Sequence, residues 1–129
     1  MIKDLRRHLE STLGIPVHYV AINETERRPC AAIRQSLFDS HQALQKANGF
    51  AVTGLQLNLY GEDYERLLDL TDEIRKHYDG SRIPLIKGGR SVKLTLEDID
   101  DDALPGEDGS DDWIYVRQIN FRIHHKLKG

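Results

Sequence analysis

The sequence predicts an α+β fold in which two helices pack on one face of a mixed or antiparallel β-sheet of about four to five strands. This prediction rests on three observations. The sequence has two amphipathic helical patterns, several runs of alternating apolar and polar residues, and Gly- or Pro-containing turns between them. The elements follow the order α-β-β-β-α-β-β. Successive strand runs can turn back as hairpins, so antiparallel pairing is natural. The length of 129 residues predicts a single domain, 1–129.

Both helical patterns place apolar residues on one face. The first covers residues 2–13 and ends at Gly14, with Pro16 shortly after, as expected at a helix C-terminus. The second begins near Asp63, whose negative charge suits the positive end of a helix dipole, and ends before Gly80. We expect its apolar stripe to comprise Tyr64, Leu67, Leu68, Thr71, Ile74 and Tyr78.

Strands are predicted wherever apolar residues recur with a period of two. The alternation is cleanest in residues 51–60, where leucines point one way and polar side chains the other. Residues 39–50 are predicted to form a long hairpin connection, and residues 81–90 are predicted to form a linker. The predicted strands are 17–22, 30–38, 51–60, 91–96 and 113–123.

The last predicted strand changes the parity of its apolar residues. Ile114 and Val116 have even numbers, whereas Ile119, Phe121 and Ile123 have odd numbers. A β-bulge or bend near the middle of this strand would bring both sets onto one face. We therefore predict a bulge near residues 117–118.

Charge is unevenly distributed although the net charge is only −3. Nine acidic residues and no basic one lie between Glu97 and Asp112, whereas both ends of the chain are basic. The acidic stretch lacks the central Gly and closing Glu of an EF-hand loop. It is predicted to be an exposed loop that is either simply solvated or faces a basic partner or repels phosphate.

The sequence offers no constellation for catalysis, metal binding or cofactor binding. The six histidines lack the spacings of zinc sites. Cys30 has no cysteine partner, which fits a reducing compartment, and its place at a strand start favours packing in the core. No apolar run reaches the roughly 20 residues needed to span a bilayer. We expect a non-enzymatic protein with no cofactor, no metal and no membrane span.

Apolar and acidic residues in the predicted connections are candidates for protein contacts. Long connections are uncommon unless they bind something or are disordered, and aromatic residues are enriched at interfaces. The alternative is that the aromatic residues cap the edge of the core. The predicted interface residues are Phe38, His41, Leu44, Phe50, Tyr60, Asp100, Asp101, Asp102, Asp108, Asp111, Asp112 and Trp113.

The layout resembles the tail-completion, or tail-terminator, proteins of long-tailed bacteriophages. The likeness rests on a helix ending in Ile15-Pro16-Val17-His18-Tyr19-Val20, a Pro-led strand from Pro29 to Ile33, and a Leu-Gln-Leu-Asn-Leu-Tyr-Gly strand at 55–61 that runs into a helix. An acidic connection and a last strand at 116–123 complete it. The likeness covers nearly the whole chain and has no short motif that would carry functional residues over.

This resemblance implies a ring, usually of six copies, at the head-proximal end of the tail tube. The ring would stop tube growth and dock the neck or head-completion proteins, and DNA would pass through its centre without specific binding. The location would be the virion, after assembly in the host bacterial cytoplasm. The acidic stretch is denser than the family leads one to expect, and could give a negative bore or be a variable loop. The alternatives are another phage neck or head-completion protein, or a small-ligand-binding or regulatory α+β domain.

Overall fold

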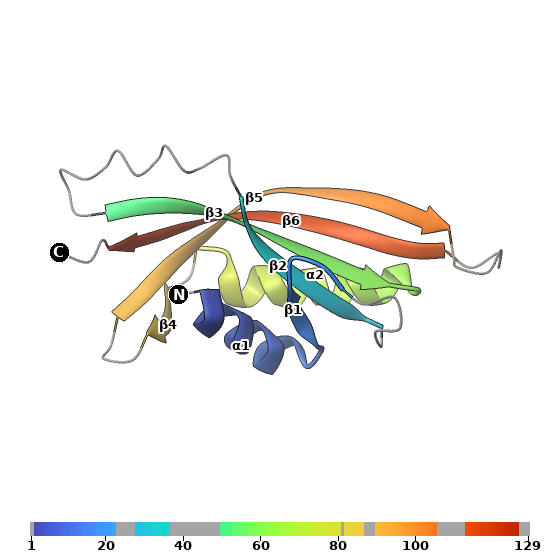
Figure 1. Ribbon diagram of the computed structural model, residues 1–129, viewed down its shortest axis with the longest axis horizontal. Helices are drawn as coiled ribbons and strands as arrows, with labels where there is room; N and C mark the ends of the chain where they lie inside the picture. Colours follow the sequence, from blue (N-terminus) through green and yellow to red (C-terminus); the bar gives the residue numbers. More distant parts are fainter. Residues whose placement is uncertain are drawn as a thin grey trace.

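The computed structural model describes residues 2–22, 28–36, 50–80, 82–86, 90–105 and 113–126 (Figure 1). Over these ranges the chain forms two helices and six strands. The elements are α1 (Ile2–Leu13), β1 (Val17–Tyr19), β2 (Cys30–Ser36), β3 (Phe50–Gly61), α2 (Tyr64–Tyr78), β4 (Arg82–Ile86), β5 (Arg90–Pro105) and β6 (Trp113–Lys126).

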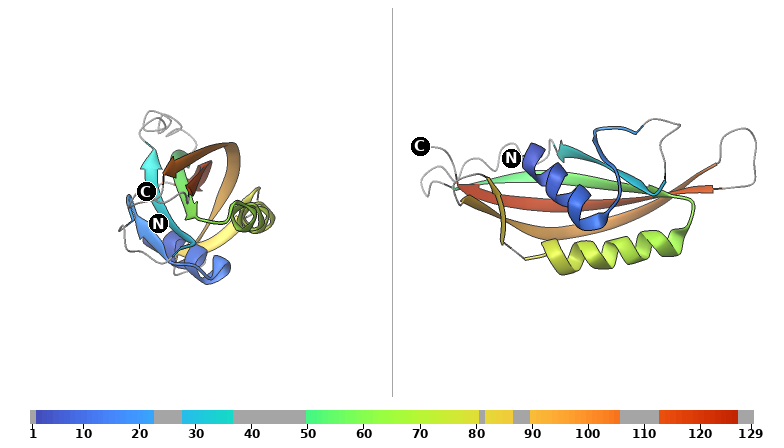
Figure 2. Two further views of the ribbon diagram at one scale, coloured as in Figure 1. Left: turned by 90° about the vertical axis from the view of Figure 1, so that its right-hand side faces the viewer. Right: turned by 90° about the horizontal axis from the view of Figure 1, so that it is seen from below.

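The strands form one mixed sheet in the order β1-β2-β3-β6-β5-β4. β1 runs parallel to β2, and every other neighbouring pair is antiparallel. Both helices lie on the same side of the sheet (Figure 2). The predicted α+β class is therefore confirmed, with one strand more than expected, because part of the predicted linker 81–90 forms β4. Pro84 is tolerated there because β4 is an edge strand.

One hydrophobic cluster lies between the helices and the sheet. The strands contribute alternate residues, as a period of two requires when only one face is covered. The helices contribute residues three and four apart. The buried members are Leu5, Leu9, Leu13, Ile15, Val17, Ala31, Ile33, Leu55, Leu57, Leu59, Leu67, Leu70, Ile74, Tyr78, Leu94, Ile119, Phe121 and Ile123.

The helix α2 is rotated slightly from the predicted orientation. Its N-cap is Asp63, whose Oδ1 accepts a hydrogen bond from the Glu65 amide at 3.0 Å. Leu70 is buried, whereas Leu68 is exposed, so the predicted placement of Leu68 in the core stripe was wrong. The leucine spacing alone allowed either residue to face the sheet, and contacts with the core decide between them.

His8 of α1 meets Tyr78 of α2 beside this core. The ring nitrogen Nδ1 lies 2.7 Å from the Tyr78 hydroxyl, and the two rings meet edge to face. Burial lowers the pKa of His8, and the nearby His77 lowers it further. Burial also raises the pKa of Tyr78. Neutral His8 can accept the hydrogen bond from the hydroxyl, and the lowered pKa favours this uncharged form.

The acidic stretch is not a loop up to residue 105, contrary to prediction. Residues up to Pro105 belong to β5 and pair with β6, with Asp100 opposite Gln118 and Asp102 opposite Val116. Pairing with β6 outweighs the low strand propensity of aspartate in this segment. The rest of the stretch, 106–112, lies outside the described residues, as do 37–49, which contain most of the predicted connection 39–50. Phe50 belongs to β3 and pairs with Lys126.

The predicted bulge in the last strand was placed on the wrong strand. The pairing of β6 with β3 is unbroken from Gly61 opposite Tyr115 to Phe50 opposite Lys126. The register shift lies in β5, between Leu96 and Asp98. The even-numbered apolar residues of β6, Ile114 and Val116, therefore face away from the helices. The change of parity arises because this end of the strand carries apolar residues on both faces.

Candidate protein-docking surface

The face of the sheet turned away from the helices is lined by alternate residues of the three longest strands. We call this surface the open face. The bulge in β5 decides which β5 residues lie on the open face. From Asp98 onward, the even-numbered residues of β5 pair with even-numbered residues of β6 and therefore share their face. Its members include Gln56, Asn58 and Tyr60 of β3, Val116, Gln118 and Asn120 of β6, and Asp98, Asp100, Asp102 and Leu104 of β5. Arg122 of β6 lies on the same face, opposite Gly54 and Thr95.

Amides and carboxylates share the middle of the open face. The Asn120 amide donates a hydrogen bond to Asp98 Oδ1, and the Asn58 amide donates one to Gln56 Oε1 at 3.3 Å. Asn58 is buried, whereas Asp98, Asp100 and Asp102 are exposed. The open face is therefore a polar layer with an exposed acidic margin along β5.

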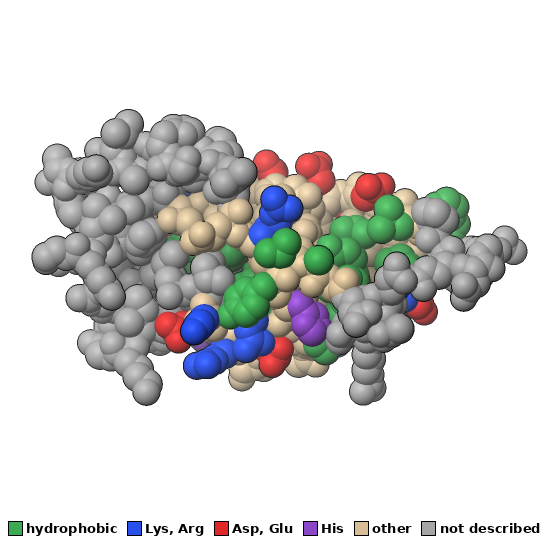
Figure 3. Space-filling model, in the orientation of Figure 1, with side chains coloured by type: hydrophobic (Ala, Val, Ile, Leu, Met, Phe, Trp, Pro, Cys, Tyr) green, Lys and Arg blue, Asp and Glu red, His purple; other side chains and the backbone are tan. Residues whose placement is uncertain are grey.

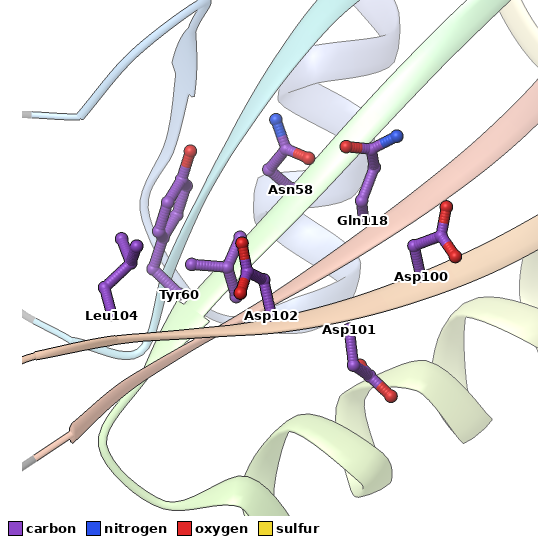
Figure 4. Close-up of a pocket in the computed structure, with 8 residues that line it drawn as sticks. Asn58, Tyr60, Asp100, Asp101, Asp102, Leu104 and Gln118 are labelled. Atoms are coloured by element: carbon purple, nitrogen blue, oxygen red, sulfur yellow. The ribbon is translucent and has the colours of Figure 1, made fainter.

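A hollow of about 390 Å³ lies on the open face toward the end of β5. We call it the ribbon hollow. Figure 4 shows Asp100 and Asp102 on the same side of β5 as Tyr60 and Gln118, while Asp101 points toward α2. Burial raises the pKa of Tyr60, with a further contribution from Cys30. The lining combines apolar side chains with carboxylates and amides: Asn58, Tyr60, Asp100, Asp101, Asp102, Leu104, Val116 and Gln118.

The far end of β5 and β6 is a two-stranded ribbon that exposes apolar side chains on both faces. The pairing of β3 with β6 stops at Gly61 opposite Tyr115, whereas β5 and β6 continue to Pro105 opposite Trp113. Leu104 is 45% exposed on one face and Trp113 is 51% exposed on the other. A two-stranded ribbon has little stability of its own in water, so this end of the sheet is a candidate contact surface.

On the helix side, the part of β5 and β6 next to the ribbon is attached to α2 by a cluster of polar and aromatic side chains. The Tyr64 hydroxyl donates a hydrogen bond to Asp101 Oδ2 at 2.7 Å, and Arg117 Nε lies 3.5 Å from Asp101 Oδ1. The Tyr64 and Tyr115 rings lie 5.3 Å apart. The hydrogen bond to Asp101 raises the pKa of Tyr64. Because these groups bind one another, the second hollow there, of about 440 Å³, offers a partner few free polar groups.

The predicted interface residues fall into four groups. Tyr60, Asp100 and Asp102 line the ribbon hollow, and Trp113 is exposed at the end of the ribbon. Asp101 also lines the hollow, but its carboxylate faces α2 and accepts a hydrogen bond from Tyr64. Phe50 lies in β3, and nothing is described of its side chain. The remaining residues lie outside the described part of the chain: Phe38, His41, Leu44, Asp108, Asp111 and Asp112.

Sequence reasoning missed Leu104, Val116 and Arg117. The parity change in residues 114–123 was the available signal for Val116, because it reports apolar side chains on a face that no helix covers. Arg117 had no such signal, since its role depends on Asp101 and Tyr64 being placed beside it by the fold.

Within the described ranges, no group of three or more His, Cys, Asp or Glu residues is placed to hold a metal ion. In the same ranges, neither helix has the length and apolar character needed to cross a membrane. Comparison of the sequence with protein-family models and with curated proteins finds no match. The open face places apolar and aromatic side chains beside exposed carboxylates.

Proposed function

We propose that this chain is a structural subunit of a long-tailed phage virion that caps the head-proximal end of the tail tube as a ring. The ring, of about six copies as the family resemblance implies, stops tube growth and forms the docking face for neck or head-completion proteins. DNA passes through its centre without specific binding. The observation that carries the proposal is the β5–β6 ribbon, which exposes Leu104 and Trp113 on opposite faces.

The two hollows fit protein contacts better than a small ligand. Ligand sites enclose most of the surface of their ligand and hold a few converging polar groups. The ribbon hollow lies on an open sheet face, and the aspartates beside it are exposed. The polar groups beside the second hollow bind one another. A surface of this kind suits a second protein, whose side chains bring their own counter-charges.

The test is to add purified protein to growing tail tubes and to image the tubes by electron microscopy. We expect a ring at one end of each tube and a halt in further growth. Bovine serum albumin at the same concentration is the control for non-specific effects on polymerisation. Bare tube ends and unchanged growth at saturating protein would refute the proposal.

A further inference from the structure

The turn after β1 exposes two apolar side chains in a strained conformation. Val20 has a φ of 65°, and the Ala21 amide donates a hydrogen bond to the Tyr19 carbonyl at 2.7 Å, which makes a γ-turn centred on Val20. A γ-turn with positive φ is rare and strained, and a β-branched residue seldom adopts it. Val20 is 63% exposed and Tyr19 is 46% exposed. We call Tyr19 and Val20 the docking turn.

The outer edge of β1 is already occupied by the chain's own groups. The Val17 amide donates a hydrogen bond to Glu10 Oε2 at 3.0 Å, and Arg6 Nη1 donates one to the Val17 carbonyl at 3.2 Å. Arg6 and Glu10 also form an ion pair with each other at 3.1 Å. The Tyr19 carbonyl is used within the γ-turn. A partner strand would find these groups taken, so a partner meets this edge through side chains.

The docking turn lies beside basic groups. The Arg6 guanidinium carbon lies 5.5 Å from the centroid of the Tyr19 ring, and Lys3 and Arg7 are exposed on α1. Figure 3 shows Lys and Arg side chains over α1, below the sheet in this view, and acidic side chains along the upper margin, near β5. Tyrosine and arginine are typical anchors of protein interfaces.

The ribbon hollow has the complementary composition. Leu104 and Val116 offer apolar contact, the Asn58 and Gln118 amides can pair with a hydroxyl, and Asp100 and Asp102 can pair with a cation. None of the described lining residues is Lys or Arg, although Arg34 of β2 is close enough to Tyr60 to offset part of the rise in its pKa that burial causes. A hollow of about 390 Å³ offers space for a tyrosine or valine side chain.

We propose that the ribbon hollow of one copy receives the docking turn of a neighbouring copy, with Asp100 and Asp102 facing the basic side chains of the neighbour's α1. This inference rests on the proposed function and names the two surfaces through which the copies of the ring meet. The contact is heterologous, because a different surface is used on each side, so it propagates from copy to copy and can close into a ring. The hollow and the turn form the centre of an interface that needs about 1,200–2,000 Å² in total.

Disulfide trapping between two single variants tests the contact. One copy carries Val20→Cys and the other carries Leu104→Cys, while the native Cys30 is buried in both. Mixed at high concentration with glutathione disulfide, the two variants are expected to form a covalent dimer that neither forms alone. The matched control replaces Leu104→Cys by Leu68→Cys, an exposed leucine of α2 outside the hollow, and should give at least tenfold less dimer.

A charge reversal tests the electrostatic part of the contact. Adding Asp100→Lys and Asp102→Lys to the Leu104→Cys copy should lower the trapping yield about tenfold at low salt, since each lost ion pair weakens the contact and like charges repel. Arg7→Glu in the Val20→Cys copy should restore part of that yield.

Each outcome decides the inference separately from the proposed function. Equal trapping in the Leu68→Cys control, homodimers from either single variant, or no dimer in the mixture would overturn the contact. If rings form on tubes but trapping fails, the proposed function stands and the contact is wrong. If trapping succeeds but no ring appears on tubes, the contact stands and the proposed function is wrong.

Discussion

Replacing Val20 by glycine is expected to leave the fold as stable as before while weakening self-association. The left-handed φ of 65° costs a non-glycine residue roughly 1–2 kcal/mol, and glycine removes that cost. Against this gain, glycine increases the freedom of the unfolded chain by roughly 0.4–1 kcal/mol. Loss of the partly covered valine side chain removes about 0.5 kcal/mol, since most of it is exposed. The net change in the free energy of unfolding lies within about 1 kcal/mol of zero.

The assay is urea-induced unfolding followed by circular dichroism, and the matched control is Ala21→Gly. Ala21 is also exposed but does not have a positive φ, so its replacement gains nothing and costs roughly 0.5–1 kcal/mol. Val20→Gly should therefore be the more stable of the two variants by about 1 kcal/mol. Both variants can also be added as competitors to the trapping assay. Ala21→Gly should lower the yield of the Val20→Cys/Leu104→Cys dimer, whereas Val20→Gly should not. A stability loss for Val20→Gly equal to that of Ala21→Gly would show that the turn is not strained.

Two further perturbations address the helix contact and the sheet edge. Burial and His77 lower the pKa of His8 below 6.5, so its contribution to stability is complete above pH 6.5 and falls as the pH drops through that value, because the unfolded chain binds the proton first. Thermal unfolding at pH 7.5 and pH 5.5 should show this loss, and a His8→Gln variant should show less of it. Replacing Glu10 by alanine removes the acceptor of the Val17 amide and should lower the free energy of unfolding by about 1–2 kcal/mol. Light scattering of the same variant should rise with concentration, since a freed edge can pair with another chain, and an unchanged signal would contradict the blocking role of Glu10.

The elements that the sequence predicted best are those whose apolar period is backed by complete burial. The bounds of α1 matched the prediction, and Leu55, Leu57 and Leu59 all face the core. In these segments the local sequence pattern and the tertiary contacts favour the same structure, so the pattern alone predicts it. The predicted residues Tyr60, Asp100 and Asp102 came together in the ribbon hollow, because they lie on strands that β6 joins.

The errors occurred where a distant partner decides the local structure. The Asp-rich segment from Asp98 to Asp102 has poor strand propensity, and its extended pairing depends on β6 and on contacts such as Asp101 with Arg117. The strand predicted over 17–22 ends at Tyr19, because the γ-turn at Val20 uses the next backbone groups. Neither outcome could be read from neighbours in sequence, since nothing there shows what lies across the sheet.

The blocked edge of β1 and the exposed side chains of the docking turn are two parts of one argument about assembly. Edge-to-edge strand pairing uses backbone groups that every strand possesses, so it discriminates poorly between partners and permits open-ended growth. A ring must instead fix the rotation from one copy to the next, because a rotation that does not close gives a filament. Side chains in a shaped hollow can fix that rotation. Glu10 and Arg6 occupy the Val17 backbone groups, and Tyr19 and Val20 are exposed beside them, which is consistent with the proposed ring.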